Sequence, residues 1–227
     1  VSVINTLKTD IPYEFTGYDE VSSTGKLLLL SSEDGEAETL EQGQSGYVVL
    51  DRSPFYAEMG GQVGDLGEIV GENFVLKVLD TKKNASGATV NIVEVIDGTV
   101  VPGPVVSTIA VPYRDAIRKN HTATHLLHKA LKLVLGTHVN QSGSLVDGQK
   151  LRFDFNHYSA LTKDELLKVE DLVNAMIMKA SPVQTDIMTI DQAKESGAMA
   201  LFDAKYGEAV RVLSVGEDSK ELCGGTH

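Results

Sequence analysis

The stretch RDAIRKNHTATHLLHKALKLVLG, residues 114–136, separates two kinds of sequence. Its apolar residues recur at the spacing of one helical face, whereas the residues before Pro112 form short apolar runs between turn signals. Gly136 supplies a stop signal, because glycine readily adopts the backbone conformation that ends a helix. The pattern predicts a long helix from Arg114 to Gly136 and a change of architecture near Pro112.

The residues before this helix predict a β-rich unit. Short apolar runs alternate with turn residues: GKLLLLSS, SGYVVLDRSPF, NFVLKVLDTKK, ATVNIVEVIDG and VVSTIAVP. Strands at this spacing, without a convincing helix among them, are typical of a small barrel. We therefore expect an N-terminal β-barrel domain over residues 1–110.

The residues from 111 onward predict a mixture of helices and strands. Thr162 and Glu165 form a capping box that opens a second helix, which should run to Ser181–Pro182. DQAKESG predicts a shorter third helix, and KLRFDFN, VQTDIMT and VRVLSVG predict strands. Because these elements do not alternate strictly, we expect an α+β domain at 111–227, with helices packed on an antiparallel sheet.

The formal net charge of −12 argues at first against a nucleic-acid partner. The charge is uneven, however. Residues 1–110 contain 17 acidic against 6 basic side chains, and residues 111–227 contain 15 against 14. The second half can therefore approach a phosphate backbone locally, through Arg114, Arg118, Lys119, Lys129 and Lys132.

Composition also indicates the cellular setting. No apolar run approaches the 18 residues of a membrane span, and the start of the chain lacks the pattern of a signal peptide. One cysteine cannot form an internal disulfide, which favours a reducing compartment. We expect a cytoplasmic protein without a membrane partner.

Three histidines share one face of the predicted helix. At about 100° per residue, His121 and His125 are about 40° apart, and His128 lies about 20° from His121 on the other side. Residues at i and i+4 can bind one metal ion, although such a stripe can also be the edge of a core. Thr122 stands where the zinc-protease helix motif has its catalytic Glu, so this is not a protease signature.

The end of the chain, ELCGGTH at residues 221–227, offers a second half-site. A lone cysteine beside a histidine is a buried apolar residue, a nucleophile or a metal ligand. The two half-sites together favour a metal, since three imidazoles and a thiolate suit tetrahedral Zn²⁺. The predicted ligands are His121, His125, Cys223 and His227. His128 is a reserve ligand that is expected to pack instead, and His138 and His157 receive no role.

The predicted zinc site leaves two roles open. Four protein ligands are typical of a closed structural site, whereas a catalytic zinc keeps one position for water. Either one ligand yields to substrate, or the metal organises a pocket beside it.

A glycine-rich loop, SPFYAEMGGQVGDLG, lies between two predicted strands. Gly60, Gly61 or Gly64 can supply the positive φ angle of a wide turn. The loop can equally face a substrate. The sequence leaves both readings open.

HTATHLLHKAL followed by ELCGGTH resembles the editing domain of alanyl-tRNA synthetases and the free-standing proteins that deacylate mischarged alanine tRNA. The blocks SPFYAEMGGQVGD, LGTHVNQSGSLV, LRFDFNH and GAMALFDAKYGEAVRVLSVG extend the resemblance over most of the chain, in order. The family chain continues after CGGTH, so the second domain is expected to be truncated at its C-terminus. The resemblance also implies that the aminoacylation domain of a parent synthetase is absent from this chain.

The resemblance implies hydrolysis of the ester that joins serine or glycine to tRNA(Ala). It implies a Zn²⁺ cofactor on the four predicted ligands, and the tRNA(Ala) acceptor end and the rest of the parent synthetase as partners. Two alternatives remain open. One is a free-standing deacylase; the other is a zinc-stabilised tRNA-binding module that does not hydrolyse.

The resemblance also implies roles for other residues. Gln141 is a polar pocket residue near the ester, and Thr124 can hydrogen-bond the serine hydroxyl. If the resemblance is set aside, the sequence favours a solvated loop position for Gln141. It likewise favours a hydrogen bond from Thr124 to the backbone of its own helix. Four glycines are expected near the substrate, two from the barrel side and two as backbone donors to an oxyanion: Gly60, Gly61, Gly224 and Gly225.

Overall fold

The structure is a computed structural model that describes residues 2–200 and 206–227. It confirms the α+β class with an N-terminal barrel. The chain divides into two compact units, one of Val1–Ala116 with Thr226 and the other of Ile117–Gly225 with His227. Each unit is described separately below.

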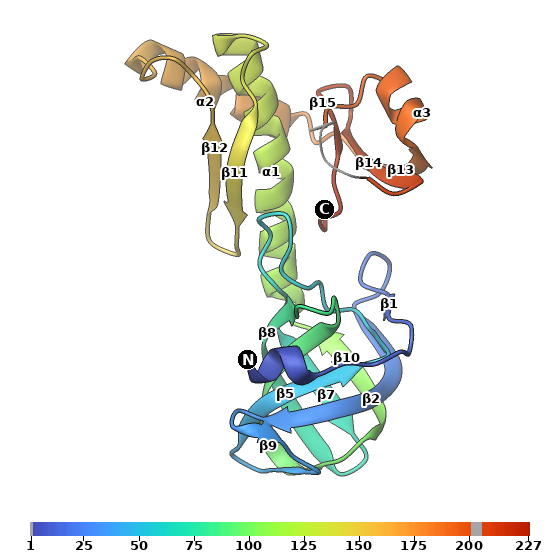
Figure 1. Ribbon diagram of the computed structural model, residues 1–227. Helices are drawn as coiled ribbons and strands as arrows, with labels where there is room; N and C mark the ends of the chain where they lie inside the picture. Colours follow the sequence, from blue (N-terminus) through green and yellow to red (C-terminus); the bar gives the residue numbers. More distant parts are fainter. Residues whose placement is uncertain (1, 201–205) are drawn as a thin grey trace. The chain divides into compact units, whose positions relative to one another are not determined.

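The first unit is an antiparallel β-barrel (Figure 1). Its sheet follows the order β10-β7-β8-β9-β5-β2 and closes because β10 also pairs with β2. The barrel strands are β2 (Ser22–Ser32), β5 (Ser45–Leu50), β7 (Gly67–Gly71), β8 (Phe74–Lys83), β9 (Thr89–Val100) and β10 (Gly103–Ile109). The short elements around them are η1 (Val3–Thr6), β1 (Glu14–Phe15), β3 (Gly35–Glu36), β4 (Leu40–Glu41) and β6 (Arg52–Ser53).

Alternation along the strands fills the barrel. In β8, Leu76 and Val78 are buried in the core while Lys77 between them is exposed. The sequence did not predict β7, because GEIVG offers only Ile69 and Val70 as apolar residues between two glycines. Pairing with β8 and β10 makes it a strand.

The glycine-rich loop forms a tight turn within the first unit. Met59 and Gln62 exchange backbone hydrogen bonds, and the two residues between them, Gly60 and Gly61, have φ angles of 61° and 86°. Positive φ at both central residues is typical of a type I′ turn and favours glycine. Gly64 is needed for another reason, because a Cβ there would collide with a backbone oxygen.

A buried ion pair anchors the same loop. Arg114 and Asp65 are 4% and 1% exposed, and the Arg114 guanidinium donates to both carboxylate oxygens of Asp65. It also donates to the backbone oxygens of Gly17, at 2.7 Å, and Pro54, at 2.8 Å. Arg114 is therefore not available to a phosphate backbone, and that expectation was wrong.

The second unit is built around α1 (Val111–Leu135), whose first residues are counted with the first unit. The helix begins three residues before the predicted start, because Pro112 fits a first turn in which the backbone N–H has no helical partner. Gly136 follows its end with φ of 124°. The other helices are α2 (Lys163–Met178) and α3 (Ile190–Glu195), and the predicted Thr162–Glu165 capping box is present on α2.

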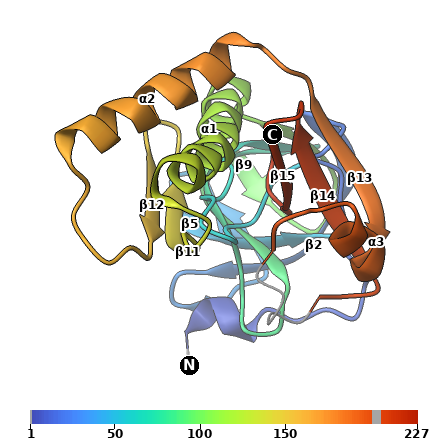
Figure 2. The same ribbon diagram turned by 90° about the horizontal axis from the view of Figure 1, so that it is seen from above.

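Antiparallel strands complete this unit, as predicted. β11 (Gln141–Val146) pairs with β12 (Leu151–Phe155), and β14 (Ala209–Val215) lies between β13 (Val183–Thr189) and β15 (Ser219–Leu222). Figure 2 shows α3 beside β13 and β14. β11 and β15 were not predicted, since QSGSLV and SKEL are largely polar.

Side chains from both long helices and from β14 form the core of the second unit. Its buried members are Leu126, Ala130, Leu131, Val139, Val169, Met176, Leu213 and Val215. Cys223 is partly buried and packs against this cluster. The core of the second unit therefore extends to Cys223, one of the four predicted metal ligands.

Among residues 2–200 and 206–227, no helix is both long and apolar enough to cross a membrane.

Candidate metal centre

The structure brings together the four residues that the sequence predicts as metal ligands. His121 and His125 lie one turn apart on α1 with stacked rings, and Cys223 and His227 follow β15. One donor atom from each residue lies within 4.8 Å of the other three. These residues therefore form a group of three imidazoles and one thiol that can bind a metal ion.

Within the group, the sulfur and the ring nitrogens lie close to one another. The Cys223 sulfur is 3.4 Å from His121 Nε2 and 3.1 Å from His227 Nε2. His125 Nε2 is buried and has no hydrogen-bond partner among the residues that the structure describes. A buried unpaired ring nitrogen is unfavourable unless something else binds it, and a metal ion fits that requirement.

Arg211 of β14 holds the CGGTH segment in place. Its guanidinium donates to the backbone oxygens of Cys223, at 3.1 Å, and Gly225, at 2.8 Å. The Gly225 N–H in turn donates to the Cys223 sulfur over 3.4 Å. Gly225 therefore supports the thiolate directly, and Gly224 between them is exposed.

Two further side chains contact the histidine rings. Glu221 of β15 is buried and accepts from His125 Nδ1 at 3.0 Å and from His128 Nδ1 at 3.1 Å, with a different oxygen for each ring. The Thr122 hydroxyl lies 3.1 Å from His227 Nδ1. An ionised carboxylate can only accept, so His125 carries a proton on Nδ1, which leaves Nε2 as the nitrogen that a metal ion would bind.

The charges in this cluster are strongly coupled. Burial alone would raise the pKa of Glu221, but the hydrogen bonds from His125 and His128 lower that pKa to about 2. Burial would likewise raise the pKa of Cys223, but its histidine neighbours lower it to about 3. Without a metal, burial lowers the pKa of His125, but Cys223 and Glu221 raise it to about 10. Cys223 is therefore a thiolate at neutral pH, which is the form that binds metals.

His227 shows the opposite balance. Burial lowers its pKa and outweighs the effect of the Cys223 thiolate, so that its pKa falls to about 4. Its ring is therefore neutral at pH 7, as a metal ligand must be.

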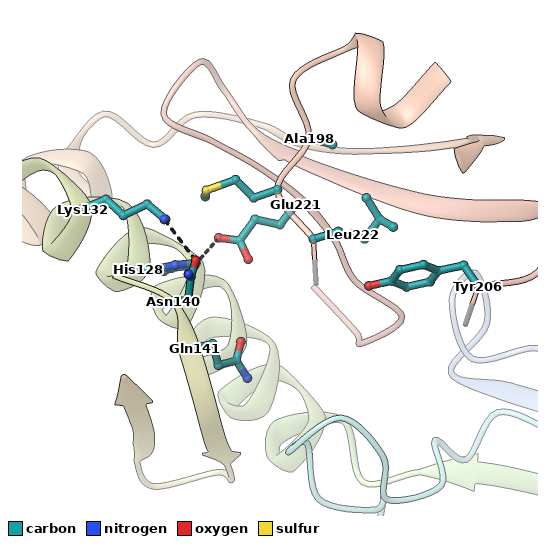
Figure 3. A pocket seen from close by; sticks show the side chains of 10 residues that line it. His128, Lys132, Asn140, Gln141, Ala198, Tyr206, Glu221 and Leu222 are labelled. Carbon is teal, nitrogen blue, oxygen red and sulfur yellow. Dashed lines mark hydrogen bonds and ion pairs between the residues drawn. The ribbon is translucent and has the colours of Figure 1, made fainter. Parts of the chain in front are cut away.

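A cavity of about 370 Å³ lies beside the group (Figure 3). Glu221 and His128 line one part of it, and Gln141 lines another. Lys132 adds a positive charge, with its Nζ 3.1 Å from the Thr137 backbone oxygen. The remaining lining residues are Asn140, Ala198, Met199, Ala200, Tyr206 and Leu222. The cavity is mixed in polarity and shares Glu221 with the candidate metal centre.

The other predicted site residues lie in different places. Gln141, the first residue of β11, lines the cavity and donates to the Ser144 hydroxyl at 3.0 Å. Thr124 is buried on α1, does not line this cavity, and donates to the Asn120 backbone oxygen at 2.9 Å. Gly60 and Gly61 belong to the first compact unit.

Sequence reasoning missed Glu221, Thr122 and Arg211. Nothing in the local sequence distinguishes Glu221 from the other acidic residues except its place two residues before Cys223. His128, the reserve ligand, lies outside the four-residue group, pairs with Glu221 and packs its ring 5.2 Å from that of Phe153. The expectation that His128 packs agrees with these contacts.

Comparison with known proteins gives the family. Residues 1–110 match the family model described as tRNA synthetases class II (A). The chain is 48% identical over all of its 227 residues to alanine–tRNA ligase 1 of Lachnoclostridium phytofermentans, 26% of whose length it covers. It is 49% identical over 226 residues, or 99% of the chain, to alanine–tRNA ligase of Acetivibrio thermocellus, again 26% of that protein.

A third relative gives the same result. The chain is 49% identical over 215 residues, or 94% of its length, to alanine–tRNA ligase of Legionella pneumophila, 25% of which it covers. The chain thus spans about a quarter of the length of the relatives that it matches. Since the match extends over both compact units at close to half identity, the chain belongs to the alanyl-tRNA synthetase family.

Proposed function

We propose that this chain is the editing part of an alanyl-tRNA synthetase, which hydrolyses serine or glycine from the 3′ end of mischarged tRNA(Ala). The observation that carries the proposal is the grouping of four donor residues that includes buried His125, whose Nε2 has no hydrogen-bond partner in the described part of the chain. The resemblance of HTATH and CGGTH to editing domains supports the same reading.

Zinc is the metal that this donor set fits best. Three imidazole nitrogens and a thiolate form a borderline-soft tetrahedral site. Bound zinc polarises an oxygen that it contacts and lowers the pKa of a bound water. His121, His125, Cys223 and His227 would hold it, and Glu221 and Thr122 contact two of these rings, those of His125 and His227.

The reaction needs few groups, because an aminoacyl ester is already activated. A water oxygen bonds to the ester carbonyl carbon, the carbon–oxygen bond to the ribose breaks, and the ribose oxygen regains a proton as the amino acid leaves. Gln141 lines the cavity beside the metal centre, and its amide can orient that water or donate to the oxyanion. The N–H groups of the CGGTH segment are further candidate donors.

A second site is needed because binding alone cannot separate these amino acids. An aminoacylation pocket that accepts alanine cannot strongly reject the smaller glycine. A separate hydrolytic site then removes the amino acid that was wrongly attached to the tRNA. Thr124 would favour serine, since its hydroxyl oxygen can still accept a hydrogen bond while it donates to Asn120.

The chain would act within a larger cytoplasmic synthetase, because the relatives are about four times as long. The tRNA(Ala) acceptor end would be its substrate partner. Two alternatives are a free-standing deacylase of the same chemistry and a module in which a closed zinc site only stabilises a tRNA-binding fold.

Deacylation assays on this chain test the proposal. Ser-tRNA(Ala) and Ala-tRNA(Ala) are incubated with the protein, and the metal content of the same sample is measured. The proposal expects fast loss of serine, slow loss of alanine and about one zinc per chain. A zinc-loaded, folded protein that hydrolyses neither ester would support the non-catalytic alternative.

Gln141→Ala should reduce the rate of serine release by about 100-fold, the effect of losing one oxyanion donor, while zinc content stays unchanged. Single-turnover deacylation with metal analysis measures both. Gln149→Ala is the matched control, because Gln149 is exposed beyond the end of the same strand. If Gln141→Ala and Gln149→Ala lower the rate of serine release equally, Gln141 has no specific role in the reaction.

Thr124→Val should reduce the preference for Ser-tRNA over Ala-tRNA by about tenfold, since an apolar isostere cannot bond the serine hydroxyl. Thr124→Ser keeps the hydroxyl and should keep the preference. The ratio of the two deacylation rates is the readout. If Thr124→Val leaves the ratio of the two deacylation rates unchanged, the Thr124 hydroxyl does not contact the substrate and only bonds the Asn120 backbone oxygen.

A further inference from the structure

Glu221 contacts two histidines, one inside the candidate ligand group and one outside it. One carboxylate oxygen contacts His125, a candidate ligand, and the other contacts His128, which lies outside the ligand group. We propose that Glu221 is the positioning residue of the metal centre, which fixes the ring of His125 so that Nε2 faces the metal. This inference rests on the proposed metal function and deepens it.

The His125 ring needs such a partner. An imidazole on a helix can direct either nitrogen toward the group, and either nitrogen can carry the proton. The Glu221 contact fixes both the orientation of the ring and the position of its proton, because the carboxylate binds Nδ1 and requires a proton there. The consequence is visible at the other nitrogen, since Nε2 is left buried without a hydrogen bond among the described residues.

His128 in turn holds the carboxylate. Its Nδ1 lies 3.1 Å from Glu221, and its Nε2 lies 3.4 Å from the Val139 backbone oxygen. The carboxylate is thus held by a second residue, which lies outside the ligand group. In Figure 3 a dashed line joins His128 and Glu221, both of which line the cavity.

This arrangement predicts an order of effects on metal affinity. Glu221→Gln keeps the shape, but its amide nitrogen must face one of the two rings, and Zn²⁺ affinity should fall about 10- to 100-fold. Glu221→Asp keeps the charge but is too short to bridge both rings, so its loss should be smaller. His128→Asn leaves the His125 contact intact and should cost less than about tenfold.

The test is a competition titration of Zn²⁺ against a chromophoric chelator at fixed pH, with the absorption spectrum of the Co²⁺ form as a report on ligand geometry. Glu217→Gln is the matched control, because it removes the same charge from an exposed turn of the same hairpin. Circular dichroism of the metal-free variants checks folding, and Glu221→Asp keeps the test available if Glu221→Gln unfolds.

The expected result is weaker Zn²⁺ binding in the order Glu221→Gln, Glu221→Asp, His128→Asn, with an altered Co²⁺ spectrum in the first. If Glu221→Gln binds Zn²⁺ as tightly as the unaltered chain, the inference fails while the proposed metal function stands. If His128→Asn loses as much affinity as Glu221→Gln, the effect is one of packing and the inference also fails. An unaltered chain that binds no metal would overturn both proposals.

Discussion

Replacing Cys223 by alanine should lower Zn²⁺ affinity by more than about 100-fold and abolish deacylation with it. The reason is that Cys223 is the thiolate of the group and lies 3.4 Å and 3.1 Å from two of the imidazoles. Loss of residues that merely orient ligands costs about 10- to 100-fold, so loss of a ligand should cost more. Metal analysis and chelator competition measure the affinity, and Ser-tRNA(Ala) hydrolysis measures the activity.

His138→Gln provides the control for that experiment. It also removes an imidazole from the second unit, but His138 pairs with His157 at 2.8 Å and lies outside the ligand group. Metal affinity and activity should therefore be unchanged. Normal zinc content and normal activity in Cys223→Ala would show that Cys223 is not a ligand.

Arg114→Met should lower the free energy of unfolding of the first unit by about 3–5 kcal/mol, the cost of removing one member of a buried ion pair. Asp65 would be left 1% exposed without its counter-charge, and the backbone oxygens of Gly17 and Pro54 would each lose a donor. The melting temperature should fall by roughly 6–20 °C. Calorimetry or thermal circular dichroism measures the shift.

Arg152→Met makes the same substitution at an exposed pair. Arg152 is 60% exposed in its side chain and lies 3.2 Å from Asp154, so screening by water should limit its effect to about 0–1 kcal/mol. A loss for Arg114→Met as small as that of Arg152→Met would mean that Arg114 does not anchor the loop.

The long elements of the fold were predictable because they repeat a pattern. The strands β8 and β9 and the helix α1 show regular apolar spacing, and a capping box marks the start of α2. The polar strands were not predictable. β11 and β15 have few apolar residues, and they are strands because neighbouring strands pair with them.

The candidate ligands could be chosen from the sequence because their residue types are rare. The chain has one cysteine and six histidines, and two of those histidines have the i, i+4 spacing on a helix. Glu221 could not be chosen in this way. It is one of 32 acidic residues, and its role follows only from the place of β15 beside the histidine face of α1.

The prediction that Arg114 can approach a phosphate backbone was wrong for a related reason. A basic residue at the start of a helix is usually solvated, and its sequence gives no sign of a buried partner 49 residues earlier. Asp65 is brought beside Tyr56 by the turn at Gly60 and Gly61, and there its carboxylate meets the Arg114 guanidinium.

The sequence by itself determined the α+β class, the barrel before the long helix, the family and the four residues of the candidate metal centre. These follow from local spacing and from rare residues, which act over a few positions of the chain. Only the tertiary structure decided which acidic residue contacts His125, which arginine is buried and which polar segments become strands. The two side-chain pairings, Arg114 with Asp65 and His128 with Glu221, join residues 49 and 93 positions apart. The polar strands pair with the neighbouring strand of their own hairpin. All of these outcomes are set in space, because desolvation and hydrogen-bond satisfaction act between spatial neighbours.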